Sequence, residues 1–458
     1  MNTQPGAKVA PVAATQAPAD QSERQGWYLV FTLLVFYMFS FIDRQIMSLL
    51  VEPMKRDLQI TDTQMGLLGG FAFAIFYTFF GIPIGRLADR VNRKGIIAVG
   101  VVIWSLMATM CGLARNFWAL FAARVGVGIG EGALSPAAYS MITDAFPRQK
   151  LGRAFSIYNM GIPIGSGIAL LVGGLVAVAV SGVGKTFTLP LFGEVRGWQF
   201  VFIVTGLPGL LLPLLLLTVR EPPRRGLIKA ADNSVPDRLP LKEVLAFMGR
   251  NGMFYRPHFL AMAMMACLGY AVGFWLPTVM ARTYGIEPGV VGTVLGISTM
   301  TMNTLGVFVA GRICDRLTAK GHTDAPIWVC FGTAVAVVVT SALPSFMPTA
   351  TLGLTMMCIA GFPFHGYVAM GPMAVNAVTP NQIRAQVSAV YLFTVNLIGL
   401  GLGPYLVPLI SDHVLRDPMQ IRWGLLIVVL VAGTIAALLL WRVRPIYRQQ
   451  VAQSAHWQ

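Results

Sequence analysis

Two pairs of ionisable residues lie inside long apolar stretches of the sequence. Asp43 and Arg44 interrupt one stretch, and Arg124 and Glu131 interrupt another. A charged side chain in hydrocarbon costs on the order of 2.5–3.5 kcal/mol unless it is paired or hydrated. An acid and a base held together can form an ion pair, exchange a proton or bind an anion. These residue types therefore predict a buried polar site with acid–base or ion-binding chemistry.

The composition places these charges in a membrane protein. Of the 458 residues, 55% are hydrophobic and 12% are charged, and the mean hydropathy is +0.67. Soluble domains carry about 25% charged residues. Apolar stretches of about 20 residues, enough for a helix to cross a bilayer, recur along the whole chain. Because these stretches are unbroken, every span is predicted to be a helix and not a barrel strand.

Twelve spans define the expected organisation. Their approximate limits are 27–51, 64–85, 95–114, 117–143, 154–180, 198–218, 254–281, 289–311, 325–346, 350–376, 386–411 and 422–442. We expect a disordered tail (1–26), a six-helix bundle (27–218), a cytoplasmic linker (219–253), a second six-helix bundle (254–442) and a C-terminal tail (443–458). In the linker, Leu241, Val244, Leu245 and Met248 share one helical face, which predicts an interfacial helix; a solvated linker is the alternative.

The basic residues predict the orientation of the bundle. An even number of spans places both termini on one side. The tails, loops and adjoining span ends on that side carry 23 Lys and Arg residues, and those on the opposite side carry 8. The positive-inside rule therefore predicts N-in/C-in. It also explains the net charge of +15 through contact with anionic membrane lipids and not with nucleic acid. We expect a monomeric, multi-pass protein of the inner or plasma membrane.

The residue patterns do not favour an enzyme. The five cysteines (111, 267, 314, 330 and 358) form no CxxC and lie in or at the ends of spans, so packed thiols are expected. The run GVGIGEG (126–132) lacks the strand that precedes a dinucleotide loop. No nucleophile–base set or metal cluster stands out. We therefore expect no cofactor and no metal.

Spacing indicates which of the four buried charges can meet. Arg124 and Glu131 are two turns apart on one face, about 10 Å along the helix. The adjacent Asp43 and Arg44 point about 100° apart and cannot pair well with each other. Asp43 and Arg124 lie at similar depth, so we expect an ion pair between them if their helices are neighbours. Arg44 is long enough to reach the deeper Glu131 directly or through water.

Two interpretations of these charges remain open. In the first, they form a static network that sets helix register, as some buried ion pairs do at little net stability. In the second, Asp43 or Glu131 takes up a proton and releases an arginine, which then binds an anion or lets the bundle rock. We favour the second because ionisable groups inside membrane spans are functional by default.

A motif occurs once in each predicted half. GRLADR (85–90) recurs as GRICDR (311–316), and Pro147, Gln149 and Tyr158 match Pro380, Gln382 and Tyr391. Each copy has the same position relative to the spans of its half. Two such halves, related by an axis along the membrane normal, are the architecture of a large class of secondary transporters.

The first copy, GRLADRVNRK (85–94), resembles the loop 2–3 motif of the major facilitator superfamily. Asn92 replaces the usual glycine, and asparagine is the next best residue for a turn with positive φ. The resemblance implies that Asp89 and Asp315 pair with neighbouring helix ends and latch the cytoplasmic side shut. The gating residues it implies are Gly85, Asp89, Arg90 and Arg93 in the first half and Gly311, Asp315 and Arg316 in the second, which lacks the trailing basic pair.

Three stretches of the first half (41–68, 124–147 and 152–167) are similar to the Spinster family, a lipid-exporting branch of this superfamily. The resemblance implies export of lysophospholipids or sphingosine-1-phosphate-like lipids, driven or modulated by protons. In the superfamily fold, spans 1, 4, 7 and 10 line a central cavity. Spans 7 and 10 offer Tyr270, Trp275, His365, Tyr367 and Asn376 as substrate-binding candidates.

The expected cavity suits an amphiphile better than a sugar. A sugar needs many amides and hydroxyls to replace its hydration, whereas spans 7 and 10 are rich in Met and aromatic residues. We expect an anionic head near Arg44 or Arg124 and a tail against spans 7 and 10. His365 is also explained by simple packing. The sequence thus predicts a proton-coupled, alternating-access lipid transporter; a drug or organic-anion exporter and a non-transporting lipid sensor are the alternatives.

Overall fold

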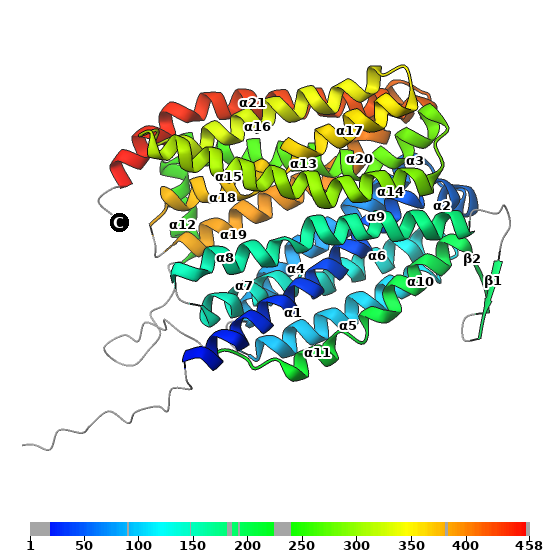
Figure 1. Ribbon diagram of the computed structural model, residues 1–458, viewed down its shortest axis with the longest axis horizontal. Coiled ribbons are helices and arrows are strands. Elements are labelled where there is room, and N and C mark those ends of the chain that lie inside the picture. The colour runs from blue at the N-terminus through cyan, green and yellow to red at the C-terminus, as the bar shows by residue number, and fades with distance from the viewer. Residues whose placement is uncertain are drawn as a thin grey trace, which may run out of the picture.

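The computed structural model describes residues 19–88, 91–146, 148–180, 186–190, 193–223, 240–380 and 383–454. Within these ranges twelve helices, some with a short break, are long and apolar enough to cross a membrane. They run along the long axis of the molecule in two halves (Figure 1). The predicted all-helical membrane fold is confirmed. The N-in/C-in orientation stays a prediction.

The elements follow the chain order of the predicted spans. The first half contains α1 (Ala19–Gln45), η1 (Ile46–Leu49), α2 (Val51–Leu58), α3 (Asp62–Gly66), η2 (Leu67–Phe71), α4 (Ala72–Ala88), α5 (Arg93–Cys111), α6 (Phe117–Glu131), α7 (Leu134–Ala145), α8 (Arg148–Asn159), α9 (Gly161–Val180), β1 (Thr186–Leu189), β2 (Gly193–Arg196), α10 (Gly197–Gly209) and α11 (Pro213–Thr218). The linker contributes α12 (Leu241–Arg250). The second half contains α13 (Gly252–Tyr284), α14 (Pro288–Ser298), η3 (Thr299–Asn303), α15 (Thr304–Ala319), α16 (Ala325–Ala342), η4 (Leu343–Phe346), α17 (Ala350–Phe364), α18 (Gly366–Ala377), α19 (Arg384–Val395), η5 (Asn396–Leu400), α20 (Gly401–Leu409), η6 (Ile410–Val414), η7 (Pro418–Gln420) and α21 (Ile421–Ser454).

Several spans are broken at points that matter for the site. Span 4 stops at Glu131 and resumes at Leu134, because Pro136 cannot donate a backbone hydrogen bond to the preceding turn. Spans 2, 8 and 11 contain π-helical turns at η2, η3 and η5. Such turns often occur at functional sites. The sequence pattern did not indicate them.

The two ends of the molecule differ in structure. Strands β1 and β2 form an antiparallel hairpin with Phe187 opposite Val195, and the end that holds them is referred to as the hairpin end (Figure 1). The opposite end, where α1 begins and α21 finishes, is the terminal end. By the predicted topology, the terminal end faces the cytoplasm.

Both tails are shorter than the sequence suggested. Helix α1 begins at Ala19, within the predicted disordered segment, and Glu23 forms a 2.5 Å ion pair with Lys150. Helix α21 continues to Ser454, past the predicted end of the last span. Its residue Tyr447 is buried against Phe254, with ring centroids 5.4 Å apart. Packing of each helix on its own half extends it beyond its apolar run. Residues 1–18, 224–239 and 455–458 lie outside the described ranges.

The predicted linker helix is present as α12. Val244 is fully buried, whereas Leu241 and Leu245 are about half exposed. The helix packs on α13 and α19 of the second half. Its contact with the membrane surface stays a prediction.

The two halves meet mainly toward the hairpin end. There α9 packs along α14, and α3 and η2 pack on α20. A Cβ atom on Gly66 would lie 2.5 Å from the Pro404 carbonyl oxygen, and one on Gly292 would lie 2.4 Å from the Leu170 carbonyl oxygen. The halves are therefore in direct backbone contact at this end. Within the described ranges, α8, α15 and α18, which reach the terminal end, take no part in extensive packing between the halves.

Candidate functional site

Arg44 and Glu131 form the central ion pair of the site. Arg44 lies in the last turn of α1, and Glu131 is the last residue of α6. The Arg44 guanidinium donates to Glu131 Oε2 through Nε at 2.7 Å and Nη2 at 2.5 Å. Ser40, one turn before Arg44, donates its hydroxyl to the same oxygen. Of the two routes that the sequence left open for Arg44, the structure has the direct one.

The expected ion pair between Asp43 and Arg124 is wrong. Both side chains are buried, at 4% and 1% exposure, but the structure forms no ion pair between them. Arg124 Nε instead donates to the Leu68 carbonyl oxygen at 3.3 Å. That carbonyl belongs to the π-helical turn η2, which spacing along spans 1 and 4 cannot reveal. Asp43 Oδ1 is buried and accepts no hydrogen bond from the described residues.

Aromatic rings enclose the Arg44 guanidinium. Its Cζ atom lies 4.9 Å from the ring centroid of Phe41, 4.5 Å from that of Phe73 and 4.8 Å from that of Tyr77. Arg124 Cζ lies 5.4 Å from the same Phe73 ring. The aromatic faces attract cations and are most effective where water is excluded.

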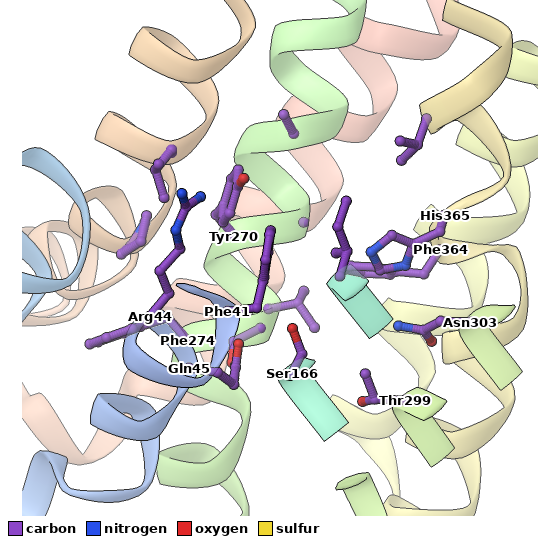
Figure 2. A pocket seen from close by; sticks show the side chains of 18 of the residues that line it. Phe41, Arg44, Gln45, Ser166, Tyr270, Phe274, Thr299, Asn303, Phe364 and His365 are labelled. Carbon is purple, nitrogen blue, oxygen red and sulfur yellow. The ribbon is translucent and has the colours of Figure 1, made fainter. Parts of the chain in front are cut away.

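A cavity of about 340 Å³ lies between the halves. The arginines Arg44 and Arg124 contribute to its wall from the first half. From the second half come Tyr270 on α13, His365 after α17 and Tyr367 on α18, as the sequence predicted. Figure 2 shows Arg44 on one side of the cavity and His365 on the other.

Two of the predicted substrate-binding residues lie elsewhere. Trp275 is fully buried and donates its indole N–H to the Pro404 carbonyl oxygen at 2.6 Å. Asn376 accepts a 3.1 Å hydrogen bond from the Ser388 hydroxyl. Neither side chain lines the cavity. Both lie on the expected spans. Trp275 is turned away from the cavity toward the Pro404 carbonyl oxygen, whereas Asn376 lies one turn beyond the cavity-lining Pro372, near the end of α18.

Sequence reasoning missed several polar residues of the cavity wall. Asn303 and Thr299 lie on the π-turn η3 of span 8, Gln45 ends α1, and Ser166 lies on α9 (Figure 2). Gln45 donates to the Gly273 carbonyl oxygen across the two halves at 2.7 Å. The signal for Asn303 was available, because an amide inside an apolar span is costly without a partner or water.

The gating motif is only partly described. Asp89 and Arg90 lie outside the described residues. Arg93 is buried and bonds to Asp144 of the first half and to Glu221 at the start of the linker, the latter at 3.0 Å. Gly85 lies near the end of α4, and Gly311, Asp315 and Arg316 lie on α15. Asp315 and Arg316 are exposed.

Asn92 differs from its expected role. Its φ is −61°, and its side chain accepts a hydrogen bond from Gly95 N as the N-cap of α5. It therefore caps a helix and does not make a turn with positive φ.

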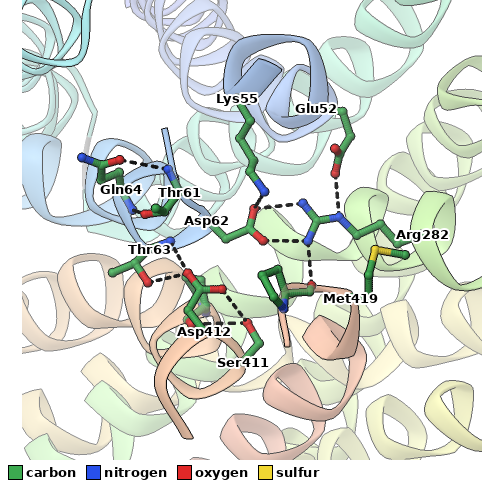
Figure 3. A network of polar contacts seen from close by, with 12 residues as sticks. Glu52, Lys55, Thr61, Asp62, Thr63, Gln64, Arg282, Ser411, Asp412 and Met419 are labelled. Carbon is green, nitrogen blue, oxygen red and sulfur yellow. Dashed lines mark hydrogen bonds and ion pairs between the residues drawn. The ribbon is translucent and has the colours of Figure 1, made fainter. Parts of the chain in front are cut away.

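A polar network joins the two halves at the hairpin end (Figure 3). Arg282, at the end of α13, donates to Asp62 Oδ2 at 2.7 Å, to Asp62 Oδ1 at 2.9 Å and to Glu52 Oε1 at 2.7 Å. Lys55 lies 2.5 Å from the same Asp62 carboxylate. The Asp62 side chain is fully buried. We refer to Glu52, Lys55, Asp62 and Arg282 as the clasp.

A second contact lies beside the clasp. Thr63 donates its backbone N–H at 3.0 Å and its hydroxyl at 2.7 Å to Asp412 Oδ2 in η6 (Figure 3). Thr61 caps α3 and so orients both Asp62 and Thr63 toward the second half. These contacts and the glycine packing close the cavity toward the hairpin end.

Comparison with known proteins finds a matching family model, related sequences and a similar solved structure. The model of the Major Facilitator Superfamily matches residues 33–404. An "MFS-type efflux pump" of Mycolicibacterium smegmatis is 27% identical over 460 aligned positions, covering 97% of this chain and 99% of that protein. Protein spinster homolog 3 of Danio rerio is 27% identical over 416 positions, covering 85% and 78%. A solved bacterial homolog of the human lysosomal transporter Spinster, inward-facing and unoccupied, has a TM-score of 0.74 at 27% identity, covering 93% of this chain and 97% of that one.

Proposed function

Because the chain belongs to the Major Facilitator Superfamily and is a membrane transporter, we propose that it carries an amphiphilic, anionic lipid by alternating access, coupled to protons. A lysophospholipid or a sphingosine-1-phosphate-like lipid fits this description. One observation carries the proposal: the Arg44–Glu131 ion pair borders a cavity whose remaining wall is largely apolar and aromatic. The resemblance of the first half to the Spinster family, which implies a lipid cargo, supports the lipid part of the proposal.

The cavity wall supports an amphiphilic substrate. The first half supplies two guanidinium groups, Arg44 and Arg124. The facing wall includes Phe274, Phe364 and Met357. A guanidinium binds phosphate or carboxylate through paired hydrogen bonds. The anionic head therefore lies against the first half and the apolar tail against the second.

The coupling proton binds Asp43 or Glu131. Glu131 compensates the charge of Arg44 through a single oxygen, and its Oε1 accepts no hydrogen bond from the described residues. Asp43 has no ion pair in the described structure, although Arg124 is on the adjoining α6. Protonation of either acid removes a negative charge beside an arginine, which frees that arginine for an anionic ligand.

The contacts between the halves support alternating access. The clasp, the Asp412 contact and the glycine packing all lie toward the hairpin end. In this conformation the cavity is therefore sealed toward that end. Transport requires that the clasp opens while the terminal ends of α4 and α15, which carry the gating motifs, come together.

The experiment is transport in proteoliposomes with labelled lysophosphatidylglycerol as the probe. Counterflow measures movement of the lipid, and an imposed pH gradient measures coupling. We expect Glu131→Gln, Asp43→Asn or both to abolish the response to the gradient. Asp324→Asn, which removes a buried carboxylate far from the cavity, is the matched control and keeps the response. An unchanged pH response in both cavity variants contradicts the coupling proposal.

Export of drugs or organic anions is the second candidate. The M. smegmatis relative is described as an efflux pump and is similar along nearly its whole length. The same arginines would then bind a smaller anion. Competition distinguishes the two functions: an organic anion that blocks lysophosphatidylglycerol counterflow, and is itself transported faster, favours this candidate.

A further inference from the structure

Arg44 contacts three aromatic rings in addition to Glu131. Phe73 and Tyr77 are one turn apart on α4 and stack on each other with ring centroids 5.3 Å apart. Phe41 lies one turn before Arg44 on α1. The three rings are within 4.9 Å of Arg44 Cζ and approach it from two different helices. We refer to Phe41, Phe73 and Tyr77 as the aromatic cage.

Glu131 is the ionic partner of Arg44, and the Tyr270 hydroxyl is a further hydrogen-bonding group beside the guanidinium. Within the described chain, its one ion-pair partner is Glu131, through Oε2 alone. That oxygen also accepts from Ser40. A proton on Glu131 removes the charge that attracts the guanidinium and weakens both Arg44 bonds. The contacts of the guanidinium with the aromatic faces do not involve Glu131 and persist.

Phe73 has a second role in the same cluster. Its ring faces Arg44 at 4.5 Å and Arg124 at 5.4 Å, so it contacts both cations. Phe73 is fully buried. Its backbone carbonyl lies against α6, where a Cβ on Gly128 would come within 2.5 Å of it. Close packing therefore restrains the backbone of Phe73, and burial restricts the movement of its ring.

We infer that the aromatic cage holds the Arg44 guanidinium at the cavity wall whether or not Glu131 is charged. Phe41, Phe73 and Tyr77 are positioning residues. Proton uptake by Glu131 then changes the net charge beside the cavity while Arg44 stays in place, and this uncompensated cation selects anionic over zwitterionic amphiphiles. The selectivity part of this inference rests on the proposed function, whereas the part on the position of Arg44 does not.

Other ionisable groups surround this arginine. They are Tyr37 and Asp43 on α1, Tyr77 on α4, Arg124 and Glu131 on α6, and Tyr270 on α13. Two of these groups are carboxyl groups, Asp43 and Glu131, and either can take up the coupling proton of the proposed function. Asp43→Asn is therefore included in each comparison below, so that an effect of Glu131 is separated from one of Asp43.

The first test measures the position of Arg44 and needs no substrate. Protein with isotope-labelled arginine is examined by NMR, and the Arg44 Nε–H signal is assigned by its loss in Arg44→Lys. Aromatic ring currents shift this signal. We expect the shift to persist in Glu131→Gln and in Asp43→Asn and to collapse when Tyr77→Leu is added to Glu131→Gln. Loss of the shift in Glu131→Gln alone overturns the inference.

The second test measures selectivity by binding of lysophosphatidylglycerol and lysophosphatidylcholine to the purified protein. Tyr77 is suited to it because its ring is only half-buried. We expect Tyr77→Leu to weaken binding of the anionic lipid by about tenfold, as the loss of a desolvated cation–π contact requires, with little change for the zwitterionic lipid. Tyr77→Phe keeps the ring and restores the wild-type affinity.

Each outcome separates the two proposals. Equal weakening of both lipids by Tyr77→Leu, or equal effects of Tyr77→Leu and Tyr77→Phe, overturns the selectivity role of the cage. If the wild-type protein binds neither lipid while the NMR shift persists in Glu131→Gln, the proposed cargo is wrong and the positioning role of the cage stands.

Discussion

The clasp allows a direct test of how the two halves are held. Asp62→Asn keeps the size of the side chain and removes its charge. Asp62 accepts from Arg282 of the second half and from Lys55 of its own half. The variant therefore weakens one contact between the halves and one contact within the first half. Contacts within a half are present in every arrangement of the halves, so only the Arg282 contact shifts the equilibrium between them.

The magnitude follows from burial. Removing one partner of a buried ion pair costs about 3–5 kcal/mol, and an exposed pair contributes about 0–1 kcal/mol. The Arg282 side chain is 8% exposed and keeps Glu52, whose side chain is 53% exposed. We therefore expect about 2 kcal/mol of lost stabilisation of the closed hairpin end. At 1.4 kcal/mol per tenfold change, this corresponds to an increase of about 30-fold in the ratio of open to closed hairpin end.

The assay is distance measurement between two spin labels at the terminal end. Gly152 on α8 and Lys320 after α15 are exposed and lie in opposite halves, and the five native cysteines are replaced. Opening of the hairpin end brings the terminal ends together, so the short-distance population grows in Asp62→Asn. Asp324→Asn is the control, because its partners Arg444 and Arg448 belong to the same half. An unchanged distance distribution in folded Asp62→Asn protein refutes the reasoning.

Three further predictions concern other parts of the fold. Gly66→Ala places a Cβ 2.5 Å from the Pro404 carbonyl oxygen, so we expect it to shift the same label distances as Asp62→Asn. The control is Gly152→Ala, because a Cβ at Gly152 would have nothing within 4 Å. Since Gly152 is one of the label positions, this control carries its label at another site, and we expect its distances to stay unchanged. Trp275→Phe removes a buried 2.6 Å hydrogen bond and should lower the free energy of unfolding by about 1–3 kcal/mol; an unchanged melting temperature contradicts this. Burial raises the pKa of Asp324, but hydrogen bonds from two arginines outweigh it and hold the pKa below the ordinary carboxyl value. Because the lowered pKa belongs to the folded state, the stabilisation is complete above about pH 4 and is lost as the pH falls through the folded pKa; the melting-temperature gap between wild type and Asp324→Asn should therefore be largest at neutral pH and close in acid.

Much of the fold was readable from local sequence. Twelve apolar runs predict twelve helices, because every backbone polar group must be satisfied within the bilayer. The repeated motif predicts two halves. Pro136 predicts the break in span 4, because the missing backbone hydrogen bond that causes the break is local to that helix. The extensions of α1 and α21 were not readable, because packing and not hydropathy sustains them.

The candidate site was readable only in part. Four charges in apolar spans indicated a polar centre, and Arg44 and Arg124 do line a cavity. Trp275 and Asn376 lie on the predicted spans, but Trp275 is on another face of its helix and Asn376 is one turn beyond the cavity. Span 7 is one unbroken helix, α13, and which of its faces meets the cavity depends on how it packs against the other helices, which spacing along the chain does not encode.

The sequence by itself determined that acids and bases share the membrane interior and at which depth, because the cost of a charge in an apolar run depends only on its neighbours along the chain. The tertiary structure decided that Arg44 and not Arg124 holds the acid, that three rings surround it, and that Asp62 meets Arg282 across the halves. These choices depend on ångström-scale placement of helices far apart in the chain. A shift of one or two ångströms breaks a hydrogen bond or an ion pair, but it hardly changes the hydrophobic partitioning that the sequence predicts.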